Sequence, residues 1–365
     1  MKILFITGSF PYIKDGIGDS AECLYNYLCK KGEVLLLTTK SKDIQKNIET
    51  RGYTNVTYID TWNFTLKNYK KIIQIISANN IEVIHIEYPG KGYGKSFLIN
   101  LLPIFLKIKY RNIKIYMRYH EFTSSRLLRK IIDIPLIISM DNIFVASYLD
   151  YKVLRKVFKE KIKKTYLGSS IDFKPIVKNR EKGKFTIAYF GFLYKGKGIE
   201  KLLELMRLLV SRDNSIKLKM LCELNENDVY HLSVKKMISD YKLENNIIIT
   251  GYLSTEQLQE QFEDIDVAAL FFDEGLTLKR TSILSFIFAG IPIITSCGDD
   301  ECNKIFNKEK DIFMSENMEE IVDYIFKLKE DEKEYNLRCK EILKLRKYFE
   351  WENITDEIYK VYLGV

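Results

Sequence analysis

Short apolar runs alternate with stretches of helical periodicity along nearly the whole chain. In its first half, the runs expected to form strands are residues 2–10, 33–39, 82–88, 113–122, 142–147 and 164–170. Several of these runs are apolar at successive positions, so both faces of the strand are expected to be buried, as in a parallel sheet that helices cover on both sides. This alternation predicts a doubly wound α/β fold.

The same alternation begins again after residue 183. The expected elements there are strands over 185–192, 216–222, 246–252, 266–272 and 291–296, and helices over 198–212, 228–242 and 282–290. The chain has 365 residues, more than a single hydrophobic core usually supports. We therefore expect two Rossmann-like domains, 1–170 and 183–348, joined by the polar stretch 169–183. They would face each other across a cleft and bind ligands beyond the carboxyl ends of their strands.

The last residues, 349–365, have the pattern of an amphipathic helix. Trp351, Ile354, Ile358 and Tyr362 recur at three- or four-residue spacing. We expect this helix to pack back on the first domain, although ordinary packing on the nearest core would give the same stripe.

The composition restricts the possible partners. The 57 basic and 49 acidic residues give a formal net charge of +8, which favours nucleotide phosphates, anionic lipid or nucleic acid, although a solvated basic surface is the commoner explanation. No basic and aromatic module for nucleic acid is present, so none is expected as a partner. The six cysteines form no C-x-x-C pair, so we expect neither a zinc site nor disulfides, and a cytoplasmic location.

One segment suggests peripheral contact with the inner face of a membrane. Residues 96–114 combine an apolar stretch with Lys107, Lys109, Arg111 and Lys114, which would suit anionic lipid. A core helix with a basic end explains the same pattern, and Pro103 argues against one straight interfacial helix. No apolar run reaches the ~20 residues that span a bilayer.

Two glycines mark the first candidate site. Gly16 and Gly18 lie in a loop, from Pro11 to Gly18, before a helix that Asp19 or Ser20 would cap. Glycines let the backbone approach a ligand, and a helix N-terminus attracts anions. The loop could therefore face a phosphate, although any surface loop that connects a strand to a helix has the same sequence pattern.

Histidines supply the next candidates. His120 ends an expected strand and is followed by Glu121, a position where α/β enzymes expose working groups. His85 lies inside an expected strand, where a structural role is at least as plausible as contact with an acceptor. His231, on a polar helix, is expected to face solvent.

The second domain repeats the design of strand, glycine loop and helix. Gly191 ends a strand, and Lys195 and Lys197 follow in the loop, where lysine suits phosphate oxygens. A solvated basic loop is the alternative.

A polar cluster surrounds a third helix start in the stretch DEGLTLKRTS. It contains Glu274, Thr277, Arg280, Thr281 and Ser282. Hydroxyls, helix N–H groups and a guanidinium suit an anion and sugar hydroxyls. Helix capping would explain the serine and threonines but not Arg280.

These segments together resemble the retaining family 4 glycosyltransferases of GT-B fold. The resemblance runs through FPYIKDGIGDSAECLYNYL, EVIHIEYP, RYHEF, GFLYKGKGIEKLL, AGIPIITS and FEWENITDEIYKVY. It implies a nucleotide-diphosphate sugar as donor, UDP- or GDP-linked, with no metal or other cofactor, and a glycan or lipid-linked acceptor of bacterial surface polysaccharide or glycoconjugate synthesis. Carried over by position, Gly16 and Gly18 approach the donor phosphates, His120 faces the transferred sugar and Lys197 holds the diphosphate. His120, Lys197 and Arg280 are the catalytic candidates, and Gly191 is a further donor-binding candidate.

Two departures from the family pattern stand out. An arginine that often follows the strand-end glycine is replaced by Phe192, and an E-x7-E acidic pair falls on Thr277 and Ser285. Arg280 or Lys195 could replace the arginine, and the loop resembles a variant form found in some relatives.

Two other functions remain compatible with the sequence. A sugar-nucleotide epimerase or phosphorylase could use the same frame, and an epimerase would form product without an acceptor. A non-catalytic nucleotide-sugar-binding protein would bind the donor without turnover.

Overall fold

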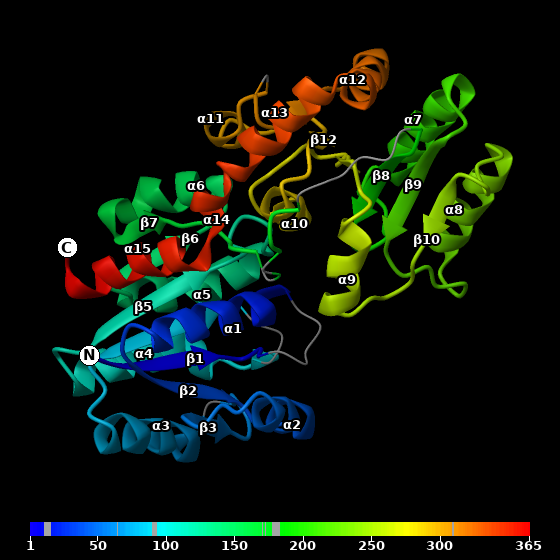
Figure 1. Ribbon diagram of the computed structural model, residues 1–365. Helices are drawn as coiled ribbons and strands as arrows, with labels where there is room; N and C mark the ends of the chain where they lie inside the picture. The colour runs from blue at the N-terminus through cyan, green and yellow to red at the C-terminus, as the bar shows by residue number, and fades with distance from the viewer. Residues whose placement is uncertain are drawn as a thin grey trace. The chain divides into compact units, whose positions relative to one another are not determined.

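The computed structural model describes residues 1–10, 16–63, 65–89, 93–169, 171, 173–176, 183–308 and 310–365. The chain divides into two compact units (Figure 1). Unit 1 comprises Met1–Ser170 and Glu350–Val365, and unit 2 comprises Ile171–Phe349. The expected linker over 169–183 falls largely outside the described residues.

Unit 1 contains a seven-stranded parallel sheet of order β3-β2-β1-β4-β5-β6-β7. Its strands are β1 (Lys2–Thr7), β2 (Glu33–Thr39), β3 (Val56–Ile59), β4 (Val83–Tyr88), β5 (Lys114–Tyr119), β6 (Asn142–Val145) and β7 (Ile162–Lys164). The strand order reverses between β1 and β4. In open α/β sheets, ligands bind beyond the carboxyl ends of the strands at such a point.

Helices cover both faces of this sheet. They are α1 (Gly16–Cys29), α2 (Lys42–Thr50), α3 (Leu66–Ala78), α4 (Leu98–Lys109), α5 (Leu127–Ser139), α6 (Tyr148–Phe158) and α15 (Trp351–Leu363), with a short 3-10 turn η2 (Lys159–Lys161). Side chains of α3, α4, α5 and α6 share one core cluster with the sheet, and those of α1, α2 and α15 share the other.

The last helix, α15, belongs to the core of unit 1. Trp351, Ile354, Ile358 and Tyr362 are all buried. The indole of Trp351 donates to the carbonyl of Ser169 at 2.8 Å. A Cβ on Gly168 would come within 2.5 Å of the Trp351 ring, so glycine is needed where the ring crosses the chain. The end of the chain is therefore fixed against the sheet.

Unit 2 contains a six-stranded parallel sheet of order β10-β9-β8-β11-β12-β13. Its strands are β8 (Phe185–Phe190), β9 (Ile216–Leu221), β10 (Ile247–Ile249), β11 (Val267–Leu270), β12 (Ile293–Thr295) and β13 (Phe313–Met314). Its helices are α7 (Ile199–Arg212), α8 (Val229–Asp240), α9 (Thr255–Phe262), α10 (Ser282–Ala289), α11 (Cys302–Ile305), α12 (Met318–Glu330), α13 (Glu332–Leu343) and α14 (Arg346–Phe349). Here the order reverses between β8 and β11.

The prediction of two Rossmann-like parallel-sheet units is confirmed, and most expected strands lie within two or three residues of their places. The strand expected over 164–170 is wrong, because β7 occupies Ile162–Lys164 instead. Its partner β6 ends at Val145, opposite Lys164, so later residues have no strand to pair with. The prediction also did not include α2, β3, α5 and α6 of unit 1, nor α9, α11, β13, α12 and α13 of unit 2.

Candidate functional site

The carboxyl ends of β8 and β11 bring three loops of unit 2 together. Gly191 follows β8, and a Cβ placed on it would lie 3.9 Å from the Cβ of Ser282, at the start of α10. Gly198 is the N-cap of α7 and has a φ of 59°, and a Cβ there would lie 2.5 Å from the Cβ of Phe271. Only glycine permits this close approach, which lays the loop before α7 on the end of β11.

Two cations lie close to the phenyl ring of Phe272. Lys197 Nζ lies 5.4 Å from the ring centroid and Arg280 Cζ lies 4.9 Å from it. Lys197 also lies 5.0 Å from the ring of Tyr194. Aromatic faces attract cations without using their hydrogen-bond donors. Both positive groups are thereby held at the reversal point of the sheet with donors available for an anion.

Arg280 retains unused bonding capacity. Its side chain is only 20 % exposed, its Nε is buried without a partner, and its Nη2 lies 3.4 Å from the Glu274 carboxylate. Glu274 itself is 87 % exposed, so the pair is weak. An oxyanion could therefore displace Glu274 and take the guanidinium in a bidentate contact.

The start of α10 adds a helix N-terminus to this group. Thr281 is its N-cap, is exposed, and makes no side-chain capping bond. The backbone N–H groups of Ile283 and Leu284 donate to the carbonyls of Arg280 and Thr281, at 3.2 and 3.0 Å, so the helix start offers a ligand its positive dipole end and the exposed Thr281 side chain. We call Lys197, Phe272, Arg280 and the α10 start the unit 2 cation cluster.

Other expected residues lie around this cluster with different exposure. Lys195 is exposed two residues before Lys197, and Thr277 is half-buried and accepts from the Arg280 backbone N–H. Ser285 is 3 % exposed inside α10. A ligand at the helix start would not reach Ser285.

Unit 1 contains a buried charge network at the ends of β4 and β5. Glu87 and Arg118 are paired across these strands and are both fully buried. Arg118 Nε donates to Glu87 Oε2 at 3.0 Å, and Arg118 Nη2 donates to the hydroxyl of Ser20 in α1 at 2.9 Å. His120 Nε2 lies 2.8 Å from Glu87 Oε2, and His85 Nε2 lies 2.9 Å from Glu87 Oε1. We call these five residues the Glu87 network.

The protonation state of the network follows from its burial. Burial raises the pKa of Glu87, but the Arg118 charge and the hydrogen bonds from His120 and His85 outweigh it and hold that pKa well below its usual range. Glu87 is therefore a carboxylate that only accepts, so both histidines donate to it through Nε2–H. His120 is left with Nδ1 as its remaining ring nitrogen.

His85 serves as a support for this network. Burial lowers the pKa of His85, and its Nδ1 accepts from the Tyr362 hydroxyl at 2.5 Å. Burial likewise raises the pKa of Tyr362 well above its usual value, so this hydroxyl keeps its proton. His85 is 0 % exposed with both nitrogens bonded, so it cannot contact an acceptor. This corrects the expectation of an acceptor-side His85.

The remaining unit 1 candidates lie near the same edge. His120 is 8 % exposed at its side chain, and the neighbouring Glu121 is exposed. Gly16 begins α1 and Gly18 lies in its first turn, with Phe10 carbonyl carbon 3.6 Å from its Cβ position. The expected loop from Pro11 falls mainly on residues outside the described ones, and Asp19 and Ser20 lie inside α1 rather than capping it.

Sequence reasoning missed Glu87, Arg118, Tyr362 and Phe272. A signal existed for the first two, because each is a charged residue inside an otherwise apolar strand. Charged residues are almost never fully buried unless they are paired. Phe272 gave no signal, since an aromatic residue at the end of a buried strand is ordinary.

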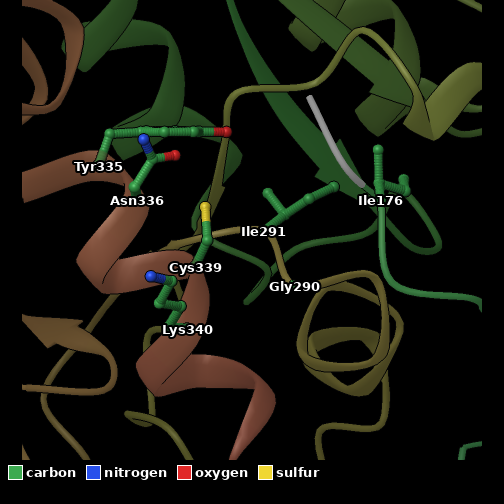
Figure 2. Close-up of a pocket in the computed structure, with 7 residues that line it drawn as sticks. All are labelled: Ile176, Gly290, Ile291, Tyr335, Asn336, Cys339 and Lys340. Atoms are coloured by element: carbon green, nitrogen blue, oxygen red, sulfur yellow. The ribbon is translucent and has the colours of Figure 1, made fainter. Parts of the chain in front are cut away.

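A cavity of about 300 Å³ in unit 2 lies away from this cluster. Figure 2 shows it lined by Ile176, Gly290, Ile291, Tyr335, Asn336, Cys339 and Lys340. Gly290 is the C-cap of α10, whereas the cation cluster is at the N-terminus of that helix. The cavity therefore does not belong to the candidate site.

Metal-binding groups and membrane-spanning helices are both absent from the described residues. In the described part of the chain, no group of three His, Cys, Asp or Glu side chains is arranged to hold a metal ion. None of the described helices is both long and apolar enough to cross a bilayer.

Known proteins resemble this chain in one domain and in overall fold. Residues 170–346 match the family model Glycosyl transferases group 1. The sucrose-phosphate synthase of Thermosynechococcus elongatus superposes with a TM-score of 0.71 at 14% identity, over 100% of this chain and 98% of that one. HepE of Anabaena, solved with UDP and glucose, gives 0.71 at 13% identity over 100% of both chains. A glycosyltransferase of Rickettsia africae gives 0.70 at 16% identity, over 100% and 98%. None of the curated proteins matches the sequence.

Proposed function

We propose that the chain is a glycosyltransferase that transfers a hexose from a nucleotide sugar with retention of configuration, because residues 170–346 match the Glycosyl transferases group 1 model and the fold is that of GT-B neighbours. The donor we propose is a UDP- or GDP-sugar, and the acceptor a glycan or lipid-linked glycan of surface polysaccharide synthesis. The observation that supports donor binding is the unit 2 cation cluster, which lies inside the matched domain.

We assign the donor diphosphate to that cluster. Lys197 and Arg280 supply two positive charges, and the α10 start supplies the positive end of the helix dipole. Groups already fixed in place stabilise charge as it develops on a leaving group without reorganising. The exchange of Glu274 for a phosphate oxygen on Arg280 would complete the site.

The reaction follows from this assignment. The bond between the anomeric carbon and the diphosphate oxygen breaks, and the acceptor hydroxyl oxygen forms the new bond on the same face. The hydroxyl proton passes to the departing diphosphate, which leaves as nucleoside diphosphate. In unit 1, the resemblance assigns His120 to the transferred sugar, and Glu87 holds its ring by Nε2.

Thr277 and Ser285 stand where the family pattern has its acidic pair, so other groups must bind the ribose or sugar hydroxyls. Ser285 is buried in α10, so it offers nothing to a donor at the helix start. Glu274 is the exposed carboxylate of the same loop. We propose that ribose or sugar hydroxyls are met by Glu274, Thr277, Thr281 and Ser282 in place of two glutamates.

Thermal shift against a panel of UDP-, GDP-, TDP-, ADP- and CMP-sugars would find the donor, because a ligand that binds only the folded state raises the melting temperature. We expect a rise with one nucleotide. If none raises it, with or without acceptor candidates present, the donor assignment is wrong.

Retention is tested by proton NMR of slow donor hydrolysis without acceptor. With an α-linked donor, the first free sugar formed should be the α-anomer. The first appearance of the β-anomer would contradict retention. A nucleotide sugar of changed stereochemistry would instead indicate an epimerase.

A further inference from the structure

Two helices of unit 1 present apolar side chains to solvent. On α5, the exposed side chains are Leu127 (74 %), Leu128 (70 %), Ile131 (54 %), Ile134 (44 %) and Ile138 (59 %). Their spacing of three or four residues places them along one side of the helix. Scattered exposed leucines are ordinary, but a continuous stripe of five is not.

The opposite side of α5 is fixed firmly to the core. Leu136 and Ile137 are buried, and so is Asp133, which accepts from the hydroxyl of Tyr88 at 2.6 Å and from that of Tyr119 at 2.5 Å. The orientation of the helix about its axis is therefore determined by buried hydrogen bonds. The exposed stripe cannot turn inward without breaking them.

The next helix, α6, repeats the arrangement. Leu149 (60 %), Val153 (43 %) and Val157 (69 %) are exposed at intervals of four residues, while Leu154 is buried in the same core cluster as Leu136. The two helices therefore cover the same face of the sheet, before and after β6 (Figure 1). We call these eight exposed side chains the α5–α6 face.

The charges around this face are almost all positive. Residues 122–164 contain ten basic and four acidic residues. Two of the acids, Asp133 and Asp150, are buried, and the other two, Asp141 and Glu160, are paired with Lys107 and Arg155. The exposed basic side chains on or beside the two helices are Arg126, Lys152, Arg155, Lys156 and Lys159.

We propose that the α5–α6 face docks on an anionic membrane surface, with its apolar side chains among the lipid headgroups. An apolar helix face flanked by lysine and arginine lies in the plane of the interface, where each basic residue gains from anionic lipid. A second copy of the chain is a poorer partner, because a symmetric contact would bring the two basic borders together.

This surface differs from the one expected over 96–114. Leu98, Ile99, Leu102 and Leu106 of α4 are buried in the core, and the Lys107 ammonium lies 2.5 Å from Asp141. The helix packs on the core through these leucines and Ile99, while Phe105 (37 %) and Ile108 (72 %) on its other side are exposed. The longer exposed apolar stripe lies on α5 and α6. The proposal does not depend on the sugar transfer proposed above, because vesicle binding requires no turnover.

Flotation of the full chain with lipid vesicles tests the proposal. We expect the protein to float with vesicles of equal parts phosphatidylglycerol and phosphatidylcholine and to bind phosphatidylcholine alone roughly tenfold more weakly or worse. The triple variant Leu127→Gln, Leu128→Gln, Ile131→Gln should lose binding to both. The double variant Leu66→Gln, Val229→Gln, at exposed apolar sites elsewhere, should bind like the original chain.

Charge is tested by Lys152→Gln with Lys156→Gln, which should weaken binding to the anionic vesicles about tenfold. Circular dichroism must show each variant folded. Absence of wild-type binding, or binding unchanged in the triple variant, would overturn the proposal. Self-association of the wild-type chain that the triple variant abolishes, without vesicle binding, would identify a second copy as the partner instead.

Insertion can be followed by fluorescence. The two native tryptophans, Trp62 and Trp351, are 2 % and 6 % exposed and are shielded from lipid. In Leu128→Trp, anionic vesicles should shift the emission to the blue, and in Val229→Trp they should not. Equal shifts in both variants would contradict docking by this face.

Discussion

The two units treat their charged groups at the strand ends in opposite ways. In unit 1, Glu87 and Arg118 are fully buried. Glu87 is bonded through both oxygens and Arg118 through Nε and Nη2, while Arg118 Nη1 has no hydrogen-bond partner. In unit 2, Lys197 and Arg280 rest on an aromatic ring, and the one carboxylate near Arg280 is exposed at 3.4 Å. The charged groups of unit 1 are closed off from solvent, whereas those of unit 2 are open to it.

This difference indicates a division of work. A closed network of buried charges resists displacement because each partner would be left uncompensated, so the Glu87 network suits the positioning of His120. An open cluster with spare donors can exchange one anion for another, so the unit 2 cation cluster suits binding.

The largest effect is expected from opening the closed network. Glu87→Gln leaves the positive charge of Arg118 buried without its partner, and we expect a loss of about 3–5 kcal/mol in the free energy of unfolding. Chemical denaturation measures it. The matched control is Glu121→Gln, an exposed carboxylate beside His120, which should change stability by less than about 0.5 kcal/mol. Equal losses in the two variants would show that the network is not closed.

Removing a cation of the open cluster should affect binding more than stability. Arg280→Ala and Lys197→Ala should each weaken donor binding by roughly 10- to 100-fold, because each loses a hydrogen bond to a charged group. Titration calorimetry with the donor found by thermal shift measures this. Arg212→Ala, at the other end of α7 in an exposed ion pair, should bind normally. Equal weakening in Arg212→Ala would exclude a local site.

Acid should weaken unit 1 through its buried histidine. The folded-state pKa of His85 is lowered from 6.5, so below that pH the unfolded chain binds a proton that the folded chain refuses. Stability is then lost as pH falls from 6.5, by at most about 1.4 kcal/mol per pH unit from this residue. Denaturation at several pH values measures the slope, and His85→Asn should flatten it. An unchanged slope would exclude His85 as its source.

The smallest effect is expected from replacing Glu274, the exposed carboxylate beside Arg280. Glu274→Gln removes the weak partner of Arg280, so competition for the guanidinium falls and stability should change by less than about 1 kcal/mol. If Glu274 only competes with phosphate, donor affinity should rise up to a few-fold. If Glu274 also binds a sugar hydroxyl, donor affinity should fall. Titration calorimetry therefore distinguishes competition with phosphate from binding of the sugar.

The sequence predicted the sheets better than it predicted the network. Strands such as β2 and β8 are marked by continuous apolar runs, because both faces of a parallel sheet are buried. The Glu87 network required knowing that β4 and β5 are neighbours in register, and strand pairing cannot be obtained from one strand at a time. The stripe on α5 was hidden for a similar reason, since its buried and exposed sides are both rich in leucine and isoleucine.

The unit 2 cation cluster was partly predictable from the sequence. Lys197 and Arg280 were proposed from their places near helix starts, and the structure places both against Phe272. The role of that ring depends on Gly198, whose backbone conformation brings the loop onto β11. Such a three-dimensional approach has no periodic signature in the sequence.

The most direct test compares kcat and KM for donor hydrolysis in His120→Ala and Arg280→Ala. If unit 1 positions His120 for the reaction and unit 2 binds the donor, His120→Ala should lower kcat about tenfold or more with little change in KM. Arg280→Ala should raise KM about tenfold and also lower kcat, because the guanidinium meets the charge that develops on the leaving diphosphate. A rise in KM for His120→Ala with kcat unchanged, or an unchanged KM for Arg280→Ala, would contradict this division of work.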